Sequence, residues 1–270
     1  MTFPQTRLTL IQRLASGGSA DDWRVFVHDY WGPVCRFAMR SGAGQLSDAE
    51  DVAAQTFEVL LENGLLSRWI SNRSARLRSV LCSVTRKILA NRNRVRAGRE
   101  RLDREAADLW AQPMAVDDEQ TEVFYAAWVE DLVRQAVDSI AADYYREGKG
   151  DYLRVLYSRI CDGASIAEMA AELEISPSSV SNYFQHARQR LADMFETLVR
   201  QHLQRYGGQD ATETEFRDEW RQLHDFLAAC GGLEAAIRRS YEVMDPSAVQ
   251  ANLRAGRRTA ATRVTSVTKR

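Results

Sequence analysis

Polar side chains that can recognise nucleic acid are concentrated between residues 178 and 188. They are Ser178, Ser179, Ser181, Asn182, Gln185 and Arg188. Hydroxyl, amide and guanidinium groups form hydrogen bonds with base edges and with phosphate oxygens. This group therefore predicts DNA binding, provided that a helix presents these side chains to solvent.

The residues around this group predict a helix-turn-helix. Ser165 and Glu168 have the spacing of a capping box, which opens a short helix that ends at Leu173. Ser176 can cap a second helix that has Pro177 at its first position, where a proline is well tolerated. Two short helices joined by about three residues are typical of this motif.

Apolar residues of the two expected helices have the spacing to pack against each other across the turn. They are Ile166, Met169, Ala170 and Leu173 in the first helix and Val180, Phe184, Ala187 and Leu191 in the second. Glu174 departs from the usual motif, because glycine is common at this turn and another residue with positive φ costs ~1 kcal/mol. An ordinary helical hairpin with a polar outer surface is the alternative.

A second candidate for contact with a polyanion is the stretch from Arg68 to Arg101. It contains eleven basic residues and a single acid, Glu100. An apolar stripe at helical spacing predicts a helix from Ala75 to about Asn93. The stripe consists of Leu77, Val80, Leu81, Val84 and Ile88. The arginines outside the stripe suit phosphate contacts, and a basic helix surface exposed to solvent is the alternative.

An acidic helix is predicted before the basic stretch. Ser47 and Glu50 have capping-box spacing, and the helix continues through DAEDVAAQTFEVLLEN. The polar residues that share one side of this helix are Asp48, Asp51, Gln55, Glu58 and Glu62. The residues expected to be buried on other sides are Val52, Phe57, Leu60 and Leu61. Periodicity alone favours a solvated acidic surface over a binding surface.

Further helices are expected near both ends of the sequence. Residues Ala20 to Met39 have an amphipathic pattern, in which Pro33 predicts a kink or a break. Two more helices are expected over Glu213–Ala229, with an apolar stripe, and over Leu233–Val243. The residues of that stripe are Phe216, Trp220, Leu223 and Leu227. The basic, threonine-rich stretch from Ala251 onward is expected to be disordered.

Composition excludes several classes of protein. The hydrophobic content of 45% and the charged content of 27% are ordinary for a globular protein, and the net charge is −1. The four cysteines are scattered, and the sequence has no phosphate-binding glycine loop, GxSxG elbow or HExxH motif. We therefore expect no enzyme activity, no metal and no cofactor. Since no apolar run approaches about 20 residues and the start lacks a signal-peptide core, we expect a cytoplasmic protein.

These motifs, in this order, resemble those of a bacterial sigma factor, and the closest type is the small two-domain extracytoplasmic-function (ECF) group. The resemblance covers roughly residues 5–200. It depends on DAED at 48–51 followed by QTF, on the arginine-rich helix and on the helix-turn-helix. The opening segments TRLTLIQRL and DDWRVFVHDYWGPV are also similar to the first helices of that group.

The resemblance implies a role for each group of residues. Core RNA polymerase would be bound by Asp48, Asp51, Gln55 and Glu58. The minus-ten promoter element would be contacted by Arg78, Arg86, Lys87, Asn91, Arg92 and Arg94. The helix from Pro177 would enter the major groove of the minus-thirty-five element. It would contact the bases there with the six polar residues Ser178, Ser179, Ser181, Asn182, Gln185 and Arg188. An anti-sigma factor or another regulator is a further candidate partner.

Three segments of the sequence depart from the family pattern. Val80-Leu81 replaces the usual Trp-Leu pair, Ala54 replaces a glutamine, and the expected recognition helix has Ser181 and Tyr183 where basic residues are common. The fold expected from the resemblance is all-α. The expected parts are a polymerase-binding domain over 1–104, a flexible acidic linker over 105–127, a helix-turn-helix domain over 128–204 and a helical C-terminal extension over 205–270.

Two other functions also fit the sequence. A stand-alone helix-turn-helix transcriptional regulator explains residues 165–191, but it leaves the acidic helix and the linker without a task. A sigma-like interaction module that no longer binds DNA is the other alternative, because the expected recognition helix is rich in serine. The C-terminal extension is expected to pack on the helix-turn-helix domain, and a regulatory docking role is the alternative.

Overall fold

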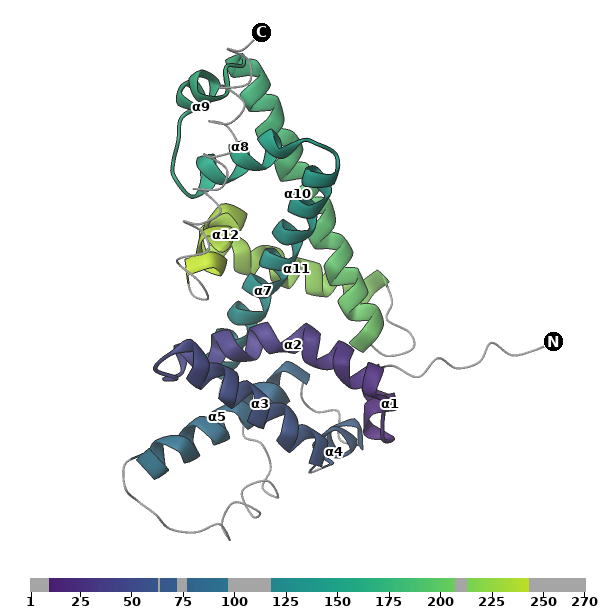
Figure 1. The fold of residues 1–270 in the computed structure, drawn as a ribbon. Helices are drawn as coiled ribbons and strands as arrows, with labels where there is room; N and C mark the ends of the chain where they lie inside the picture. The colour runs from purple at the N-terminus through teal and green to yellow at the C-terminus, as the bar shows by residue number, and fades with distance from the viewer. Residues whose placement is uncertain (1–9, 63, 72–76, 97–117, 207–212, 243–270) are drawn as a thin grey trace, which may run out of the picture. The chain divides into compact units, whose positions relative to one another are not determined.

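The computed structural model describes residues 10–62, 64–71, 77–96, 118–206 and 213–242, and every regular element in them is an α-helix (Figure 1). The expected all-α class is therefore confirmed. The helices are α1 (Leu10–Ala15), α2 (Ala20–Arg40), α3 (Leu46–Glu62), α4 (Leu65–Ser71), α5 (Leu77–Arg96), α7 (Asp118–Arg146), α8 (Gly150–Ile160), α9 (Ile166–Leu173), α10 (Pro177–Tyr206), α11 (Glu213–Ala229) and α12 (Gly232–Glu242). None of these helices is long and apolar enough to cross a membrane.

The chain divides into two compact units. Unit 1 comprises residues 1–131 and 202–212, and unit 2 comprises residues 132–201 and 213–270. The divisions fall inside α7, after Asp131, and inside α10, after Gln201. Each of these two long helices therefore contributes one segment to each unit.

The flexible linker expected over residues 105–127 is corrected in its second half. Residues 118–127 form the first turns of α7, and Phe124 and Ala127 are fully buried. The acidic segment 118–127, whose composition suggested disorder, is thus the start of a helix. Residues 105–117 lie outside the described residues.

Helix α2 runs through the centre of unit 1. Ser19 and Asp22 form a capping box at its start, and the helix continues past Pro33 to Arg40, so the expected break does not occur. Phe26 packs edge-on against Phe57 of α3, with ring centroids 5.7 Å apart. Phe37 packs in the same way against Phe124 of α7, at 5.4 Å. Aromatic pairs therefore connect α2 to α3 and α7.

Helices α3 and α5 also pack against each other and against α2. The predicted apolar stripe of α5, from Leu77 to Ile88, is buried as expected. The capping box expected at Ser47 does not form, because α3 begins at Leu46 and Ser47 lies inside the helix. Leu61 was expected to be buried, but it is 58% exposed.

Unit 2 has a small apolar core where α8, α9 and α10 meet. Buried Val155, Met169, Ala170 and Val180 form it, and Leu173 and Phe184 pack against it. Ile166, expected in this core, occupies the first position of α9 and is 36% exposed.

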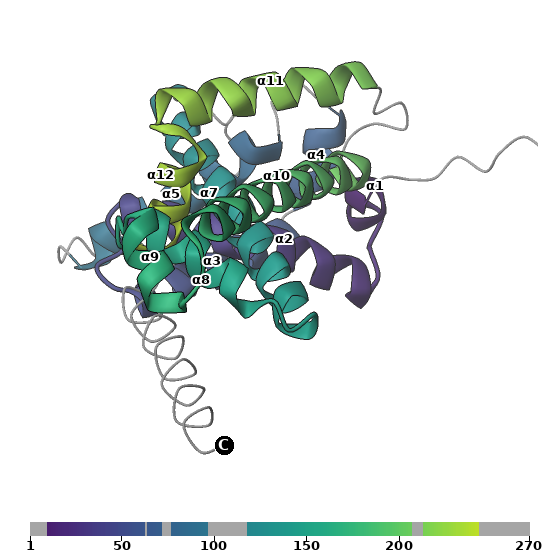
Figure 2. The ribbon, with the colours of Figure 1, turned by 90° about the horizontal axis from the view of Figure 1, so that it is seen from above.

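Helices α11 and α12 belong to unit 2, and their observed bounds agree closely with the expected ones. Trp220 of α11 contacts Phe195 of α10, with ring centroids 6.1 Å apart, where the two helices lie side by side (Figure 2). The Arg200 guanidinium lies 3.6 Å from the centroid of the Phe216 ring. The described part of the C-terminal extension thus packs on α10 within unit 2.

Candidate functional site

The residues expected to bind base edges lie on the N-terminal part of α10, and most of them are exposed. Ser178, Asn182, Gln185 and Arg188 are exposed, whereas Ser179 and Ser181 are half-buried. At 3.6 residues per turn, Ser178, Asn182 and Gln185 share an arc of roughly 60° around the helix. We call this group the amide–hydroxyl surface.

The turn before α10 positions this surface. Ser165 and Glu168 form the expected capping box at the start of α9. Glu174 ends α9 in the left-handed conformation, with φ 55° and ψ 40°, and its N–H bonds to the Ala170 carbonyl. Ile175 N also donates to that carbonyl, at 3.1 Å. The structure therefore retains the tight turn with a glutamate at the position that favours glycine.

The serine hydroxyls at the start of α10 are hydrogen-bonded to one another around the helix cap. Ser176 Oγ accepts a hydrogen bond from Ser179 N at 3.1 Å, as the sequence predicted for a helix cap. The same Oγ lies 2.8 Å from Ser178 Oγ and 2.9 Å from Ser179 Oγ. The hydroxyls at the start of α10 therefore form one hydrogen-bonded group, and Asn182 and Gln185 present the amides beyond it.

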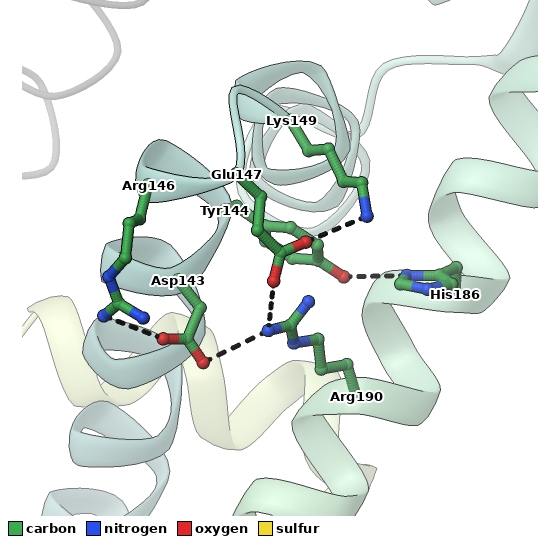
Figure 3. Close-up of polar contacts among 7 residues, drawn as sticks. All are labelled: Asp143, Tyr144, Arg146, Glu147, Lys149, His186 and Arg190. Carbon is green, nitrogen blue, oxygen red and sulfur yellow. Dashed lines mark hydrogen bonds and ion pairs between the residues drawn. The ribbon is translucent and has the colours of Figure 1, made fainter.

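A network of polar contacts fixes one side of α10 to the end of α7 (Figure 3). Arg190 Nη2 lies 2.8 Å from Glu147 Oε1 and 3.2 Å from Asp143 Oδ2. Tyr144 Oη lies 2.9 Å from His186 Nδ1. Hydrogen bonds from Arg190, and then from Lys149, lower the pKa of Glu147 to about 2. The Arg190 guanidinium on this side of α10 is thus paired with two carboxylates.

The acidic side of α3 is exposed, as the sequence predicted. Asp51, Gln55 and Glu58 are exposed, and Asp48 is half-buried. The opposite side of α3 places Val52, Phe57 and Leu60 in the core of unit 1. Asp51, Gln55 and Glu58 are therefore exposed to solvent along about two turns of α3.

The basic residues expected on α5 are only partly available to a ligand. Asn91 and Arg94 are exposed, and Arg86 and Lys87 are half-buried. Burial, and then the nearby charge of Arg68, lowers the pKa of Lys87. Arg92 Nη2 lies 3.2 Å from Asp51 Oδ2, so a residue expected to bind DNA is paired with one expected to bind polymerase.

The prediction that Arg78 contacts the minus-ten element is corrected by the position of its side chain. Its side chain is buried, with the residue 9% exposed, and its guanidinium lies 4.4 Å from the Trp128 ring centroid and 4.8 Å from that of Tyr125. Both aromatic rings belong to the first half of α7. Tyr125 lies inside the segment expected to be a flexible linker, and Trp128 is the residue that follows it. Because this segment covers Arg78, the residue stabilises the packing of unit 1 and does not present its charge to DNA.

Sequence reasoning missed a group of buried charges along α2. Asp29 accepts hydrogen bonds from Arg205 Nη1 and from Tyr206 Oη, the latter at 2.7 Å. Arg36, which is fully buried, lies 3.5 Å from Asp131. Asp29 and Arg36 lie between apolar residues in the part of the α2 pattern that faces the core. A charged residue at such a position is the sequence signal that could have predicted a buried ion pair. Asp29 and Arg36 hold the ends of α7 and α10 that belong to unit 1.

No protein-family model, curated protein or solved structure matches this chain. The function is therefore inferred from these surfaces and from the order of the motifs in the sequence.

Proposed function

We propose that this chain is a promoter-specificity subunit of the sigma type, which binds core RNA polymerase and directs it to promoter DNA. The observation that carries the proposal is the exposed acidic side of α3, formed by Asp51, Gln55 and Glu58. In the ECF group, which the sequence resembles, the corresponding helix binds a basic coiled coil of the polymerase. A surface with this charge complements such a partner.

The amide–hydroxyl surface of α10 supports the second part of the proposal. It follows a tight turn between α9 and α10, and it lies at the start of α10, where a recognition helix of a helix-turn-helix contacts base edges. Amides pair with adenine and hydroxyls pair with several bases, so this surface is suited to direct contacts in the major groove. Asn91 and Arg94 are the exposed candidates on α5 for contact with the minus-ten element, and Arg86 and Lys87 are half-buried candidates.

The test is reconstitution with core RNA polymerase. The wild-type chain is expected to form a stable complex and to start transcription from a matched promoter in a library. Glu58→Arg reverses a charge at an exposed position of α3 and is expected to reduce polymerase affinity by at least tenfold. Asp225→Arg makes the same charge change at an exposed position of α11 and is the control. Failure of the wild-type chain to bind polymerase would refute the proposal.

A stand-alone helix-turn-helix regulator is the second candidate, and one observation favours it. Of the basic residues expected on α5, Arg78 is buried and Arg92 is paired with Asp51. This helix therefore offers less free positive charge for melted promoter DNA than its sequence suggested. Tight, sequence-specific binding to duplex DNA in the absence of polymerase would favour this candidate over the sigma type.

A further inference from the structure

Two arginines flank one aromatic ring beside the amide–hydroxyl surface. The guanidinium carbon of Arg159, at the end of α8, lies 5.3 Å from the centroid of the Phe184 ring. That of Arg188, on α10, lies 5.6 Å from the same centroid. One ring therefore makes cation–π contacts with two arginines from different helices.

A third arginine joins them from the C-terminal extension. Arg238 of α12 is exposed, and its Nη2 donates a hydrogen bond of 2.8 Å to the carbonyl oxygen of Ile160, the residue next to Arg159. Helices α8 and α12 pack against each other at this point. We call Arg159, Arg188 and Arg238 the basic cluster.

The basic cluster is not neutralised in the way that the opposite side of α10 is. There, Arg190 is shared by two carboxylates, Asp143 and Glu147 (Figure 3). In the basic cluster, Arg188 has one ion pair, with Glu234 of α12, at 3.6 Å. The side chains of this pair are 54% and 50% exposed, so water screens the attraction and the pair contributes little. A phosphate can therefore replace Glu234 at small cost.

The position of the cluster matches that of a backbone contact. At 3.6 residues per turn, Arg188 lies roughly 90° around α10 from the centre of the amide–hydroxyl surface. A helix in the major groove contacts bases with its central side and phosphates with residues at its edges. Arginine is well suited to this task, because its planar guanidinium forms paired hydrogen bonds with phosphate oxygens.

We propose that the basic cluster binds the phosphate backbone of duplex DNA, and that α12 of the C-terminal extension is part of the DNA interface. The inference rests on the part of the proposed function in which α10 binds DNA. Arg238 supplies a phosphate contact from outside the helix-turn-helix. Glu234 weakens the binding, because its carboxylate competes with phosphate for Arg188.

The experiment measures binding of the full-length chain to a labelled duplex of mixed sequence over a series of salt concentrations. A phosphate contact is independent of base sequence, so the promoter need not be known. Arg238→Gln is expected to weaken binding several-fold and to reduce the slope of log K against log salt by about 1. Glu234→Gln is expected to tighten binding several-fold. Arg238→Lys keeps the charge and is expected to retain the wild-type salt slope.

Arg217→Gln is the matched control. Arg217 is also an arginine of the C-terminal extension, but it lies on α11, where its side chain is 70% exposed and pairs with Glu213. The inference is overturned if Arg238→Gln and Arg217→Gln have the same affinity and salt slope, or if Arg238→Gln loses affinity while its salt slope stays unchanged. A melting curve for each variant shows whether the fold is retained.

The result also separates this inference from the proposed function. If the chain binds polymerase and Arg238→Gln changes nothing, the inference fails and the sigma-type proposal stands. If the chain does not bind polymerase but Arg238→Gln reduces duplex binding with the expected slope, the sigma-type proposal fails and the inference stands. Absence of any duplex binding by the wild-type chain overturns the inference alone, since polymerase binding is measured independently.

Discussion

Arg92 of α5 donates a hydrogen bond to Asp51 of α3, with Nη2 and Oδ2 3.2 Å apart. Its other terminal nitrogen donates to the backbone carbonyl of Asp48 at 3.0 Å. The acidic helix and the basic helix, to which the family resemblance assigns different partners, are thus directly hydrogen-bonded to each other in unit 1. A molecule that binds Asp51 must compete with Arg92 or accept both side chains together.

The first prediction concerns this pair. Because the Asp51 side chain is 66% exposed, the ion pair is expected to contribute no more than about 1 kcal/mol to the free energy of unfolding. A double-mutant cycle with Arg92→Ala and Asp51→Ala, followed by urea denaturation, measures the coupling. A coupling of several kcal/mol would contradict this estimate. Arg92→Ala is also expected to strengthen polymerase binding, because it releases Asp51. A loss of polymerase binding by this variant would show that Arg92 itself contacts the polymerase.

The second prediction concerns the turn before α10. Glu174 has φ 55°, a conformation that costs a residue with a side chain about 1 kcal/mol or more, whereas glycine adopts it freely. Glu174→Gly is therefore expected to raise the free energy of unfolding. The gain is at most about 1 kcal/mol, because glycine also increases the entropy of the unfolded chain, which opposes it. Chemical denaturation measures the change.

Glu172→Gly is the control for Glu174→Gly. It places the same glycine two residues earlier, inside α9, where glycine costs about 1 kcal/mol relative to a helix-forming residue. The two variants are therefore expected to change stability in opposite directions. Equal destabilisation by both would show that the Glu174 side chain, rather than its backbone, stabilises the turn.

The elements of this fold were largely predictable from the sequence, because helical periodicity and capping are local. The apolar stripe from Leu77 to Ile88 predicted the buried side of α5, and Ser165 with Glu168 predicted the start of α9. The expected cap at Ser47 was wrong for a local reason as well, since α3 begins one residue earlier. Several residues can start a helix, and the spacing alone does not choose between them.

The environment of the charged residues was not predictable in the same way. Arg78 is covered by Trp128, which is fifty positions later in the chain. The acidic sequence that precedes Trp128 suggested a linker, so the sequence did not predict this contact. Likewise, Asp29 pairs with Arg205 through contacts that depend on how the helices pack. On α10, by contrast, the predicted exposure of Asn182 and Gln185 is confirmed, because the position of Val180 in the core fixes which side of the helix faces solvent.

The third prediction concerns Gly32, which lies inside α2 against α7. A β-carbon at this position would overlap the Asp131 carboxylate, which is buried beside Arg36. Gly32→Ala is expected to destabilise the protein by about 1–3 kcal/mol, although alanine favours a helix by about 1 kcal/mol. Gly44→Ala is the control, since its β-carbon would lie 3.7 Å from Asp48 Oδ2, an ordinary contact. Thermal melts of both variants measure the difference, and equal melting temperatures would contradict the close packing at Gly32.

The last prediction concerns pH and the network around Arg190. Hydrogen bonds from Arg190 and Lys149 lower the pKa of Glu147 from 4.5 to about 2. A carboxylate whose pKa is lower in the folded state stabilises the fold above its unfolded pKa, and this stabilisation is lost as the pH falls. Glu147→Gln is therefore expected to be less stable than the wild type at pH 7. The difference is expected to shrink between about pH 4.5 and pH 2 and to vanish below that range.

Urea denaturation of the wild type and of Glu147→Gln across this pH range measures the difference directly. Asp225→Asn removes an exposed carboxylate outside the network and controls for the change in net charge. A stability difference that stays constant down to pH 2 would show that Glu147 acts through packing and not through its charge. Because Arg190 and Tyr144 join α10 to α7 in the same network, Glu147→Gln at neutral pH is also expected to weaken duplex binding slightly, with the salt slope unchanged.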